Sequence, residues 1–304
     1  MRLAFALLLL SSVARAAPEP YGIILMAHGG DASWNKEIET LRARVNAKVP
    51  TEAALGMADP KTLQAAVDLL EKRGVKRIVA VPLYVQSRSE VLDQTRYALG
   101  LSDTPSEVLR AGLERMAAAH AHHLPGGHGH SMEFSTERVK ARAPIAMARA
   151  LDDHDLVGRI LGERANALAG KAPKAHLVLV AHGPVDEAAV PVWRDSMLSL
   201  CARASKGGKF VDCATALLRD DAAPEIRAAA VADLREKVAR TKEGRAGPVV
   251  VVPLLIARGG IERKIPKDLS GLDFAWDGKT LMPHAGFDAW VLERAATAEW
   301  AARP

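Results

Sequence analysis

The chain has 304 residues, of which 49% are hydrophobic, 25% charged and only 4% aromatic. This length and composition suit a globular protein of about two domains, and they exclude a disordered or collagen-like chain. The few aromatic residues argue against a stacking surface for single-stranded nucleic acid. The formal net charge of +5 is compatible with an anionic small molecule, and it is too weak alone to indicate a nucleic-acid partner.

The N-terminus has the features of a secretory signal peptide. Met1 and Arg2 give a positive start, residues 3–13 are apolar or small, and Ala14-Arg15-Ala16 is an A-x-A cleavage signal. The apolar run is too short to span a bilayer comfortably, and no later stretch approaches the length of a spanning helix. We therefore expect cleavage after Ala16, a periplasmic or secreted mature protein, and no membrane span after cleavage.

Strand and helix patterns alternate through the first half of the chain. Trp34, Ile38, Leu41 and Val45 recur at helical spacing, and Asp59-Pro60 is a typical helix start. Continuous apolar strands joined by helices are typical of a parallel sheet covered on both faces. Strands are expected at 22–27, 52–57, 77–85 and 138–147, with a helix from about 153 to 169 after them.

The second half repeats the landmarks of the first. Residues 21–29 and 175–183 are both apolar runs that end in Ala-His-Gly, and a later pair of runs ends in Val-Pro-Leu. His154 and His284 precede a Glu-Arg-Ala at the same offset. Landmarks in one order indicate an internal duplication. The expected elements are strands at 176–181, 210–217, 248–256 and near 280, and helices at about 187–204, at 224–240 and from about 286.

The sequence thus predicts an α/β protein with two similar flavodoxin-like lobes, each with a mainly parallel four-stranded sheet flanked by helices. The expected divisions are a signal peptide at 1–16, an N-terminal lobe at 17–172 and a C-terminal lobe at 173–304. Residues from about 100 to 136 have no counterpart of that length in the second half and are expected to form an insertion. It contains five candidate metal ligands, unless it is an incidental surface loop: His120, His122, His123, His128 and His130.

Two residues far apart in the chain are expected to share the main site. Ligands of an open parallel sheet bind beyond the carboxyl ends of the strands, where the strand order reverses. In a flavodoxin-like order this point lies between the first and third strands, which end near His28 and Glu90. An imidazole and a carboxylate together can hold a divalent transition metal or accept protons. His182 and Glu262 are the corresponding candidates in the second half.

Further residues are candidates for binding substrate. Gly29 and Gly30 would let a ligand approach the backbone at the start of the next helix, and Arg88 and Arg258 could hold carboxylates. Each candidate has a structural alternative, such as a histidine bonded into a turn or a solvated loop charge. Three histidines are expected to be caps or packing residues: His154, His176 and His284.

The two cysteines carry none of this chemistry. Cys201 and Cys213 match no zinc or iron–sulfur spacing. An exported compartment would permit a disulfide between them, and two buried thiols are the alternative.

The motifs in this order resemble the CbiX-type sirohydrochlorin chelatases, in their long two-lobed form. Residues 24–30, 78–85 and 151–156 carry the resemblance. These class II chelatases insert cobalt or ferrous iron into a tetrapyrrole bound between the lobes, without nucleotide hydrolysis. The resemblance implies a chelatase of cobalamin or siroheme-type biosynthesis, with sirohydrochlorin or a related tetrapyrrole and Co²⁺ or Fe²⁺ as substrates. Glu90 stands where the family usually has a second histidine, and this His/Glu pair is similar to that of the protoporphyrin ferrochelatases.

The resemblance implies no cofactor beyond the substrate metal, and no iron–sulfur cluster, because the cysteine motif of some long relatives is missing. The main alternative is a non-catalytic periplasmic protein that binds or delivers a metal or a tetrapyrrole. A histidine phosphatase is disfavoured because Ala27 and Ala181, not arginines, precede the two histidines. The sequence leaves open the metal, the tetrapyrrole, the active lobe and whether the protein forms a homo-oligomer.

Overall fold

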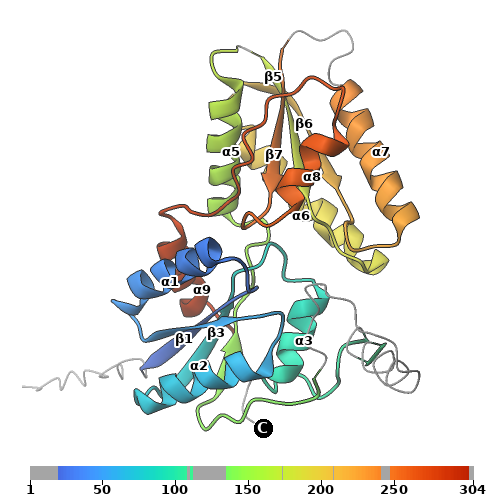
Figure 1. Cartoon of the computed structure of the whole chain (residues 1–304). Coiled ribbons are helices and arrows are strands. Elements are labelled where there is room, and N and C mark those ends of the chain that lie inside the picture. The colour runs from blue at the N-terminus through green and yellow to red at the C-terminus, as the bar shows by residue number, and fades with distance from the viewer. Residues whose placement is uncertain are drawn as a thin grey trace, which may run out of the picture.

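The computed structural model describes residues 20–107, 110–111, 135–172, 174–207, 209–240 and 247–300. These residues form two α/β lobes, one above the other in Figure 1. The expected signal peptide and the five histidines of the insertion lie outside the described residues. No helix in the described ranges is long and apolar enough to cross a membrane.

The first sheet has four parallel strands in the order β2-β1-β3-β4. The strand order therefore reverses between β1 and β3, as the flavodoxin-like expectation required. The adjacent carboxyl ends are linked where Leu83 N donates to Met26 O at 2.7 Å. The strands are β1 (Tyr21–Ala27), β2 (Thr51–Leu55), β3 (Arg77–Pro82) and β4 (Ile145–Met147).

The strand β4 is much shorter than the expected 138–147. The backbone before it is held by side chains of a neighbouring helix instead of by a strand. Lys140 N donates to Gln64 Oε1 at 2.7 Å, and Ala143 N donates to Glu71 Oε1 at 2.9 Å. Because these amides already have acceptors, this segment makes no sheet ladder.

Helices cover both faces of the first sheet. Asp31 and Asp59 cap the first two helices by accepting hydrogen bonds from the amides of Trp34 and Lys61. The stripe from Trp34 to Val45 is buried as predicted. The helices are α1 (Ala32–Asn46), α2 (Pro60–Lys72) and α3 (Glu90–Ala98), and α2 and α3 share one face.

The second sheet has three strands, in the order β6-β5-β7, among the residues that the structure describes. The expected fourth strand near 280 does not form: Leu281 N and Met282 N donate to Leu255 O and Ile256 O, beyond the end of β7. The strands are β5 (Ala175–Ala181), β6 (Phe210–Leu217) and β7 (Val249–Leu254). A short 3-10 turn (Glu187–Ala189) leads into α6 (Val190–Ala204), and α7 (Pro224–Arg240) and α8 (Ile261–Asp268) follow.

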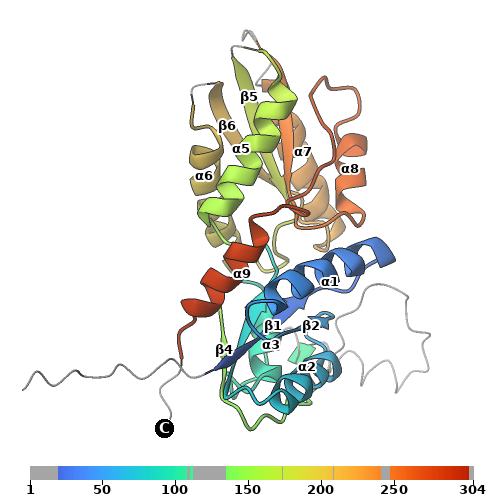
Figure 2. The same ribbon diagram turned by 90° about the vertical axis from the view of Figure 1, so that its left-hand side faces the viewer.

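Two helices cross between the lobes. The helix α5 (Asp155–Ala169) packs on α6 and β7 of the second lobe, and α9 (Phe287–Ala296) packs on α1 and β3 of the first. Figure 2 shows α9 beside α1 and α5 beside the second sheet. The division at 172/173 therefore separates the strands of the two lobes but not these helices, each of which the sequence pattern places in its own half.

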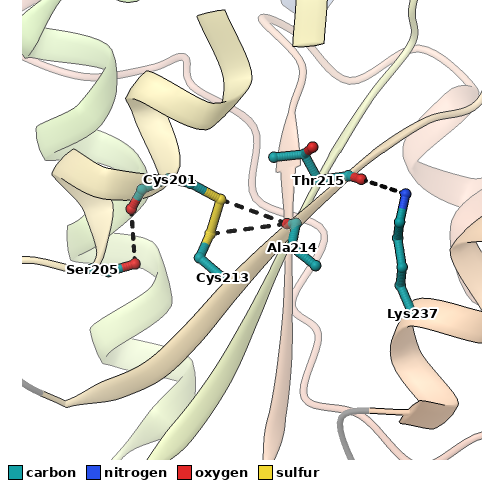
Figure 3. Close-up of a disulfide and its surroundings, with 6 residues drawn as sticks. All are labelled: Cys201, Ser205, Cys213, Ala214, Thr215 and Lys237. Atoms are coloured by element: carbon teal, nitrogen blue, oxygen red, sulfur yellow. Dashed lines mark hydrogen bonds between the residues drawn. A yellow bond between two sulfur atoms is a disulfide. The ribbon is translucent and has the colours of Figure 1, made fainter. Parts of the chain in front are cut away.

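Cys201 and Cys213 form a disulfide that joins α6 to β6, with their Cα atoms 5.7 Å apart (Figure 3). The structure thus favours the disulfide over the two buried thiols that the sequence left open. It fixes the helix of the second lobe that contacts the first lobe at the site described next.

Candidate functional site

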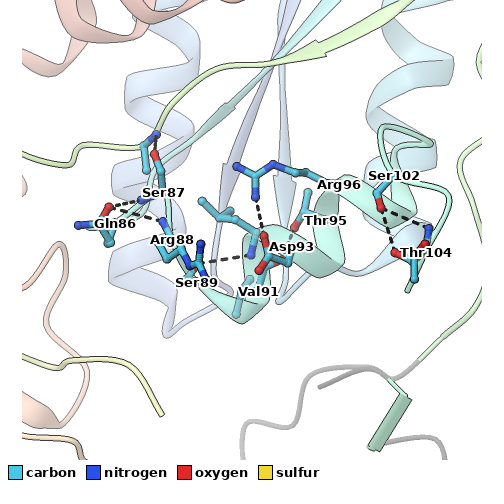
Figure 4. Close-up of polar contacts among 12 residues, drawn as sticks. Gln86, Ser87, Arg88, Ser89, Val91, Asp93, Thr95, Arg96, Ser102 and Thr104 are labelled. Atoms are coloured by element: carbon cyan, nitrogen blue, oxygen red, sulfur yellow. Dashed lines mark hydrogen bonds and ion pairs between the residues drawn. The ribbon is translucent and has the colours of Figure 1, made fainter. Parts of the chain in front are cut away.

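The loop after β3 in the first lobe makes direct contacts with the second lobe. Figure 4 shows this loop and the start of α3. Gln86 Nε2 donates to Ser196 Oγ at 2.9 Å, and Trp193 Nε1 donates to Arg88 O at 3.2 Å. Both partners lie on α6. The loop at the switch point of the first sheet is therefore part of the interface between the lobes.

His28 follows β1 at this same edge and is held by its own loop. Its Nδ1 lies 3.0 Å from Gly29 O, so Nδ1 carries the hydrogen and donates it. The ring stacks on Trp34 with centroids 5.0 Å apart, and Trp34 Nε1 donates to His28 O at 2.8 Å. In the described part of the chain, His28 Nε2 makes no hydrogen bond, so a neutral ring offers a lone pair there. This is the tautomer that a metal ligand or a base needs.

Gly30 makes the stacking of His28 possible. A Cβ at Gly30 would lie 2.5 Å from Trp34 Cδ1, whereas a Cβ at Gly29 would meet open space. Gly30 is therefore needed for packing, and Gly29 leaves room beside the imidazole for a ligand.

Glu90 begins α3 and faces the second lobe. Asp186 N, from the loop after β5, donates to Glu90 Oε1 at 3.0 Å. Glu90 and His28 thus lie on the same edge of the sheet, but they make no hydrogen bond or ion pair with each other among the described residues. Arg88, two residues before Glu90 on the same loop, is exposed.

The histidine of the second lobe has a different environment. His182 Nδ1 lies 2.6 Å from Gly183 O, as in the first lobe, but its Nε2 lies 3.0 Å from Asp221 Oδ2. Burial disfavours the charged ring, yet the Asp221 carboxylate outweighs it and raises the pKa of His182. Both ring nitrogens then face acceptors, so the ring is stabilised as a cation and offers no lone pair.

Glu262 is not the partner of His182. It is buried and accepts hydrogen bonds from Gly259 N at 3.0 Å and Gly260 N at 2.8 Å at the start of α8. Burial alone would raise the pKa of this carboxyl, but the two amides outweigh it and hold the pKa below its usual value. The expected His182/Glu262 pair is absent from the described residues, and Arg258 is exposed on the same loop.

The three histidines expected to be structural are so. His154 caps α5 by accepting from Leu156 N at 3.1 Å, and His284 accepts from Gly286 N at 3.0 Å. His176 is buried and bonded to Asp212 at 2.8 Å.

Sequence reasoning missed two acidic residues near the sheet edges. Asp221 bonds to His182, and Asp152 is buried beneath the loop that begins at Gln86. Asp152 lies inside a motif already noted, between Leu151 and His154, whereas no local pattern marks Asp221. Within the described ranges, no cluster of three or more His, Cys, Asp or Glu side chains could hold a metal ion.

Residues 22–87 match the model of the CbiX family. No curated protein matches the chain. Among solved structures, SirB from Bacillus subtilis with Fe³⁺ aligns with a TM-score of 0.60 at 13% identity, over 91% of this chain and 94% of SirB. The sirohydrochlorin chelatase SirB from Bacillus subtilis subspecies spizizenii in complex with cobalt aligns with a TM-score of 0.56 at 12% identity, with the same coverage.

DR2241 from Deinococcus radiodurans, a multi-domain protein with structural similarity to chelatases, aligns with a TM-score of 0.51 at 17% identity, over 93% of this chain and 56% of its own length. At these identities the alignments show a shared fold. The chain therefore has the two-lobed chelatase fold, and the segment similar to the CbiX family, residues 22–87, includes His28 and ends in the loop after β3.

Proposed function

We propose that this protein is a metal chelatase that inserts Co²⁺ or Fe²⁺ into sirohydrochlorin or a related tetrapyrrole. The observation that carries the proposal is the Nε2 of His28, which has no partner among the described residues and lies at the switch point of a chelatase-type sheet. The match of residues 22–87 to the CbiX family supports the same reaction. The metal and the tetrapyrrole are both substrates, and no further cofactor is proposed.

The proposed reaction exchanges a divalent cation for two pyrrole protons. His28 Nε2 holds the incoming metal at an open coordination site, next to the room left by Gly29. Binding between the lobes bends the macrocycle, so that nitrogen lone pairs point out of its plane towards the metal. Glu90 accepts one of the two released protons, and His28 Nε2 accepts the other once the metal has left it for the macrocycle. Arg88, exposed on the same loop, binds carboxylates of the macrocycle.

We assign this reaction to the first lobe. His28 and His182 occupy equivalent strand ends, but Asp221 already occupies Nε2 of His182. Glu262 is likewise engaged by the amides of its own loop. The second lobe then contributes the wall that the loop 86–90 faces.

We also propose that the protein works outside the cytoplasm. The signal-peptide features of residues 1–16 support export. The disulfide between Cys201 and Cys213 supports an oxidising compartment, since such bonds rarely persist where thiols are kept reduced.

The test is metal insertion by the purified mature protein, followed by absorbance with sirohydrochlorin and Co²⁺ or Fe²⁺. We expect His28→Ala to lower the insertion rate by about 100-fold or more, since the variant loses both the metal ligand and a proton acceptor. His182→Ala is the matched control from the second lobe and should insert metal at close to the wild-type rate. An unchanged rate in His28→Ala would remove His28 from the mechanism. Tight metal binding by the wild type without turnover on any tetrapyrrole would favour a carrier instead.

A further inference from the structure

The loop that carries Arg88 and Glu90 is bound through Ser87 to a buried carboxylate, that of Asp152. The side chain of Asp152 is only 2% exposed. Its Oδ1 accepts a hydrogen bond from Ser87 N at 2.7 Å, and its Oδ2 accepts one from Ser87 Oγ at 2.7 Å. Ser87 Oγ in turn accepts from Ala150 N at 2.8 Å. Ser87 is therefore fixed at both its backbone and its side chain.

Two arginines balance the buried charge of Asp152. Arg149 Nε donates to Asp152 Oδ2 at 3.1 Å. Arg294 comes from the crossing helix α9 and donates to Leu151 O at 3.2 Å. Burial lowers the pKa of Arg294, and the charge of Asp152 acts in the opposite direction. Asp152 has φ +48°, a conformation that Asp and Asn adopt more readily than most residues.

The second lobe provides an internal comparison. In both lobes, two consecutive amides donate to two consecutive carbonyls just beyond the strand that follows the second helix of the lobe, β3 or β7. The amides of Leu151 and Asp152 donate to Tyr84 O and Val85 O, and the amides of Leu281 and Met282 donate to Leu255 O and Ile256 O. In this alignment Met282 stands at the place of Asp152, and Arg258 stands at the place of Ser87. The second lobe thus forms this pair of backbone hydrogen bonds without a carboxylate. The contact between Asp152 and Ser87 in the first lobe therefore has another role.

The role of the Asp152–Ser87 contact follows from the contacts that the same loop makes with the second lobe. Between Gln86 and Glu90, the loop makes its contacts with Ser196, Trp193 and Asp186 of the second lobe. Anchored at Ser87 on one side, the loop presents these groups to the other lobe in one geometry. We infer that Asp152 is a positioning residue, which holds Arg88 and Glu90 at the interface where the macrocycle is proposed to bind. This inference rests on the proposed function.

The experiment compares wild type, Asp152→Asn and Ser87→Ala with a control, Asp268→Asn. Asn keeps the tolerance for positive φ and removes the charge. Asp268 also accepts from an arginine, Arg227, at 2.7 Å, but it lies at the end of α8. Metal-insertion kinetics give kcat and KM for sirohydrochlorin with Co²⁺. Hydrogen exchange of a peptide covering residues 84–92 reports the loop directly, and thermal unfolding reports stability.

We expect Asp152→Asn to lower kcat by about 10- to 100-fold, since small misplacements of reacting groups have effects of this size. KM should rise as well, because a displaced Arg88 binds the carboxylates of the macrocycle less well, and exchange in residues 84–92 should accelerate. Ser87→Ala should change kcat and the exchange rate in the same directions. Asp268→Asn should change neither. Unchanged exchange, or faster exchange with wild-type kcat, would overturn the inference. A wild type that inserts no metal would refute the proposed function, whereas the exchange rates would still show whether Asp152 holds the loop.

Discussion

At the scale of single residues, one carboxylate distinguishes the two repeated histidines. His28 and His182 follow equivalent strands, and each directs Nδ1 at the carbonyl of the next glycine. Among the described residues, His182 has a carboxylate at Nε2, that of Asp221, and His28 has none. A ring between a carbonyl and a carboxylate favours the cation, whereas His28 can present a lone pair. The two strand ends therefore carry the same residue type in different chemical environments.

The His182–Asp221 pair predicts a pH-dependent stability. The raised pKa of His182 means that its contribution is present below the ordinary histidine pKa and is lost as the pH rises through the folded value. The pKa of Asp221 is lowered, chiefly by its hydrogen bond to His182, so its contribution is lost only in acid. Because Asp221 is mostly exposed, water screens the pair, and we expect Asp221→Asn to lower the free energy of unfolding by about 0.5–1 kcal/mol at pH 6.

At pH 9 the same variant should differ little from wild type. Urea unfolding at both pH values measures the difference. Asp93→Asn is the control, because Asp93 pairs with Arg96, which does not titrate in this range. An equal loss at pH 6 and pH 9 would show that His182 is not charged in the folded protein.

At the scale of helices, the repeated His-Glu offset has a structural explanation. The histidines at the starts of the crossing helices, the cap His154 of α5 and His284 just before α9, each reach a glutamate on the opposite helix. His154 Nε2 lies 3.0 Å from Glu293 Oε1, and His284 Nε2 lies 3.3 Å from Glu163 Oε2. The two contacts are reciprocal between α5 and α9. The repeated His-Glu offset in the sequence therefore corresponds to two contacts between the helices that cross from one lobe to the other.

The packing of α5 on α6 depends on helical glycines. A Cβ at Gly158 would lie 2.7 Å from Arg203 Cβ. Gly→Ala in a helix usually stabilises by about 1 kcal/mol, but this contact reverses the sign. We expect Gly158→Ala to lower the free energy of unfolding by about 1–3 kcal/mol, the usual range for overpacking. Chemical denaturation checks this, with exposed Arg159→Ala on the same helix as the neutral control; a more stable Gly158→Ala would contradict the packing.

At the scale of the whole molecule, neither half of the sequence contains a complete lobe. The sheet of the second lobe is covered by α5, which precedes it in the chain, and the sheet of the first lobe by α9, close to the end of the described residues. The buried faces of these helices include Leu156 and Ile160 on one, and Phe287 and Trp290 on the other. A lobe without its crossing helix would expose an apolar sheet face.

Fragments divided at the sequence boundary should therefore complement each other. We expect residues 17–172 and 173–304, produced separately, to bind a dye that reports exposed apolar surface and to unfold without a cooperative transition. Mixed, they should associate and regain cooperative unfolding, because each supplies the helix that the other lacks. Circular dichroism and size-exclusion chromatography measure this. Two separately folded, cooperative fragments would contradict the exchange of helices.

The local patterns of the sequence were sufficient for much of the fold. Apolar stripes such as Trp34–Val45, and caps such as Asp59, depend on neighbours a few residues away, so they predicted elements and their starts. The repeated sequence motifs and the strand pattern together predicted two lobes and the switch point between β1 and β3. His28 could be proposed for the same reason: it directly follows a strand that is apolar throughout.

The tertiary structure decided which elements and side chains meet. An apolar helix face requires burial but does not specify a sheet, so the sequence could not assign α5 and α9 to opposite lobes. The segment before β4 is irregular because Gln64 and Glu71, far away in the chain, bind its amides. Asp221 beside His182 and Asp152 beneath Ser87 are likewise long-range contacts. Such contacts have no periodicity, because they depend on how the chain returns to a place and not on the residues next to it.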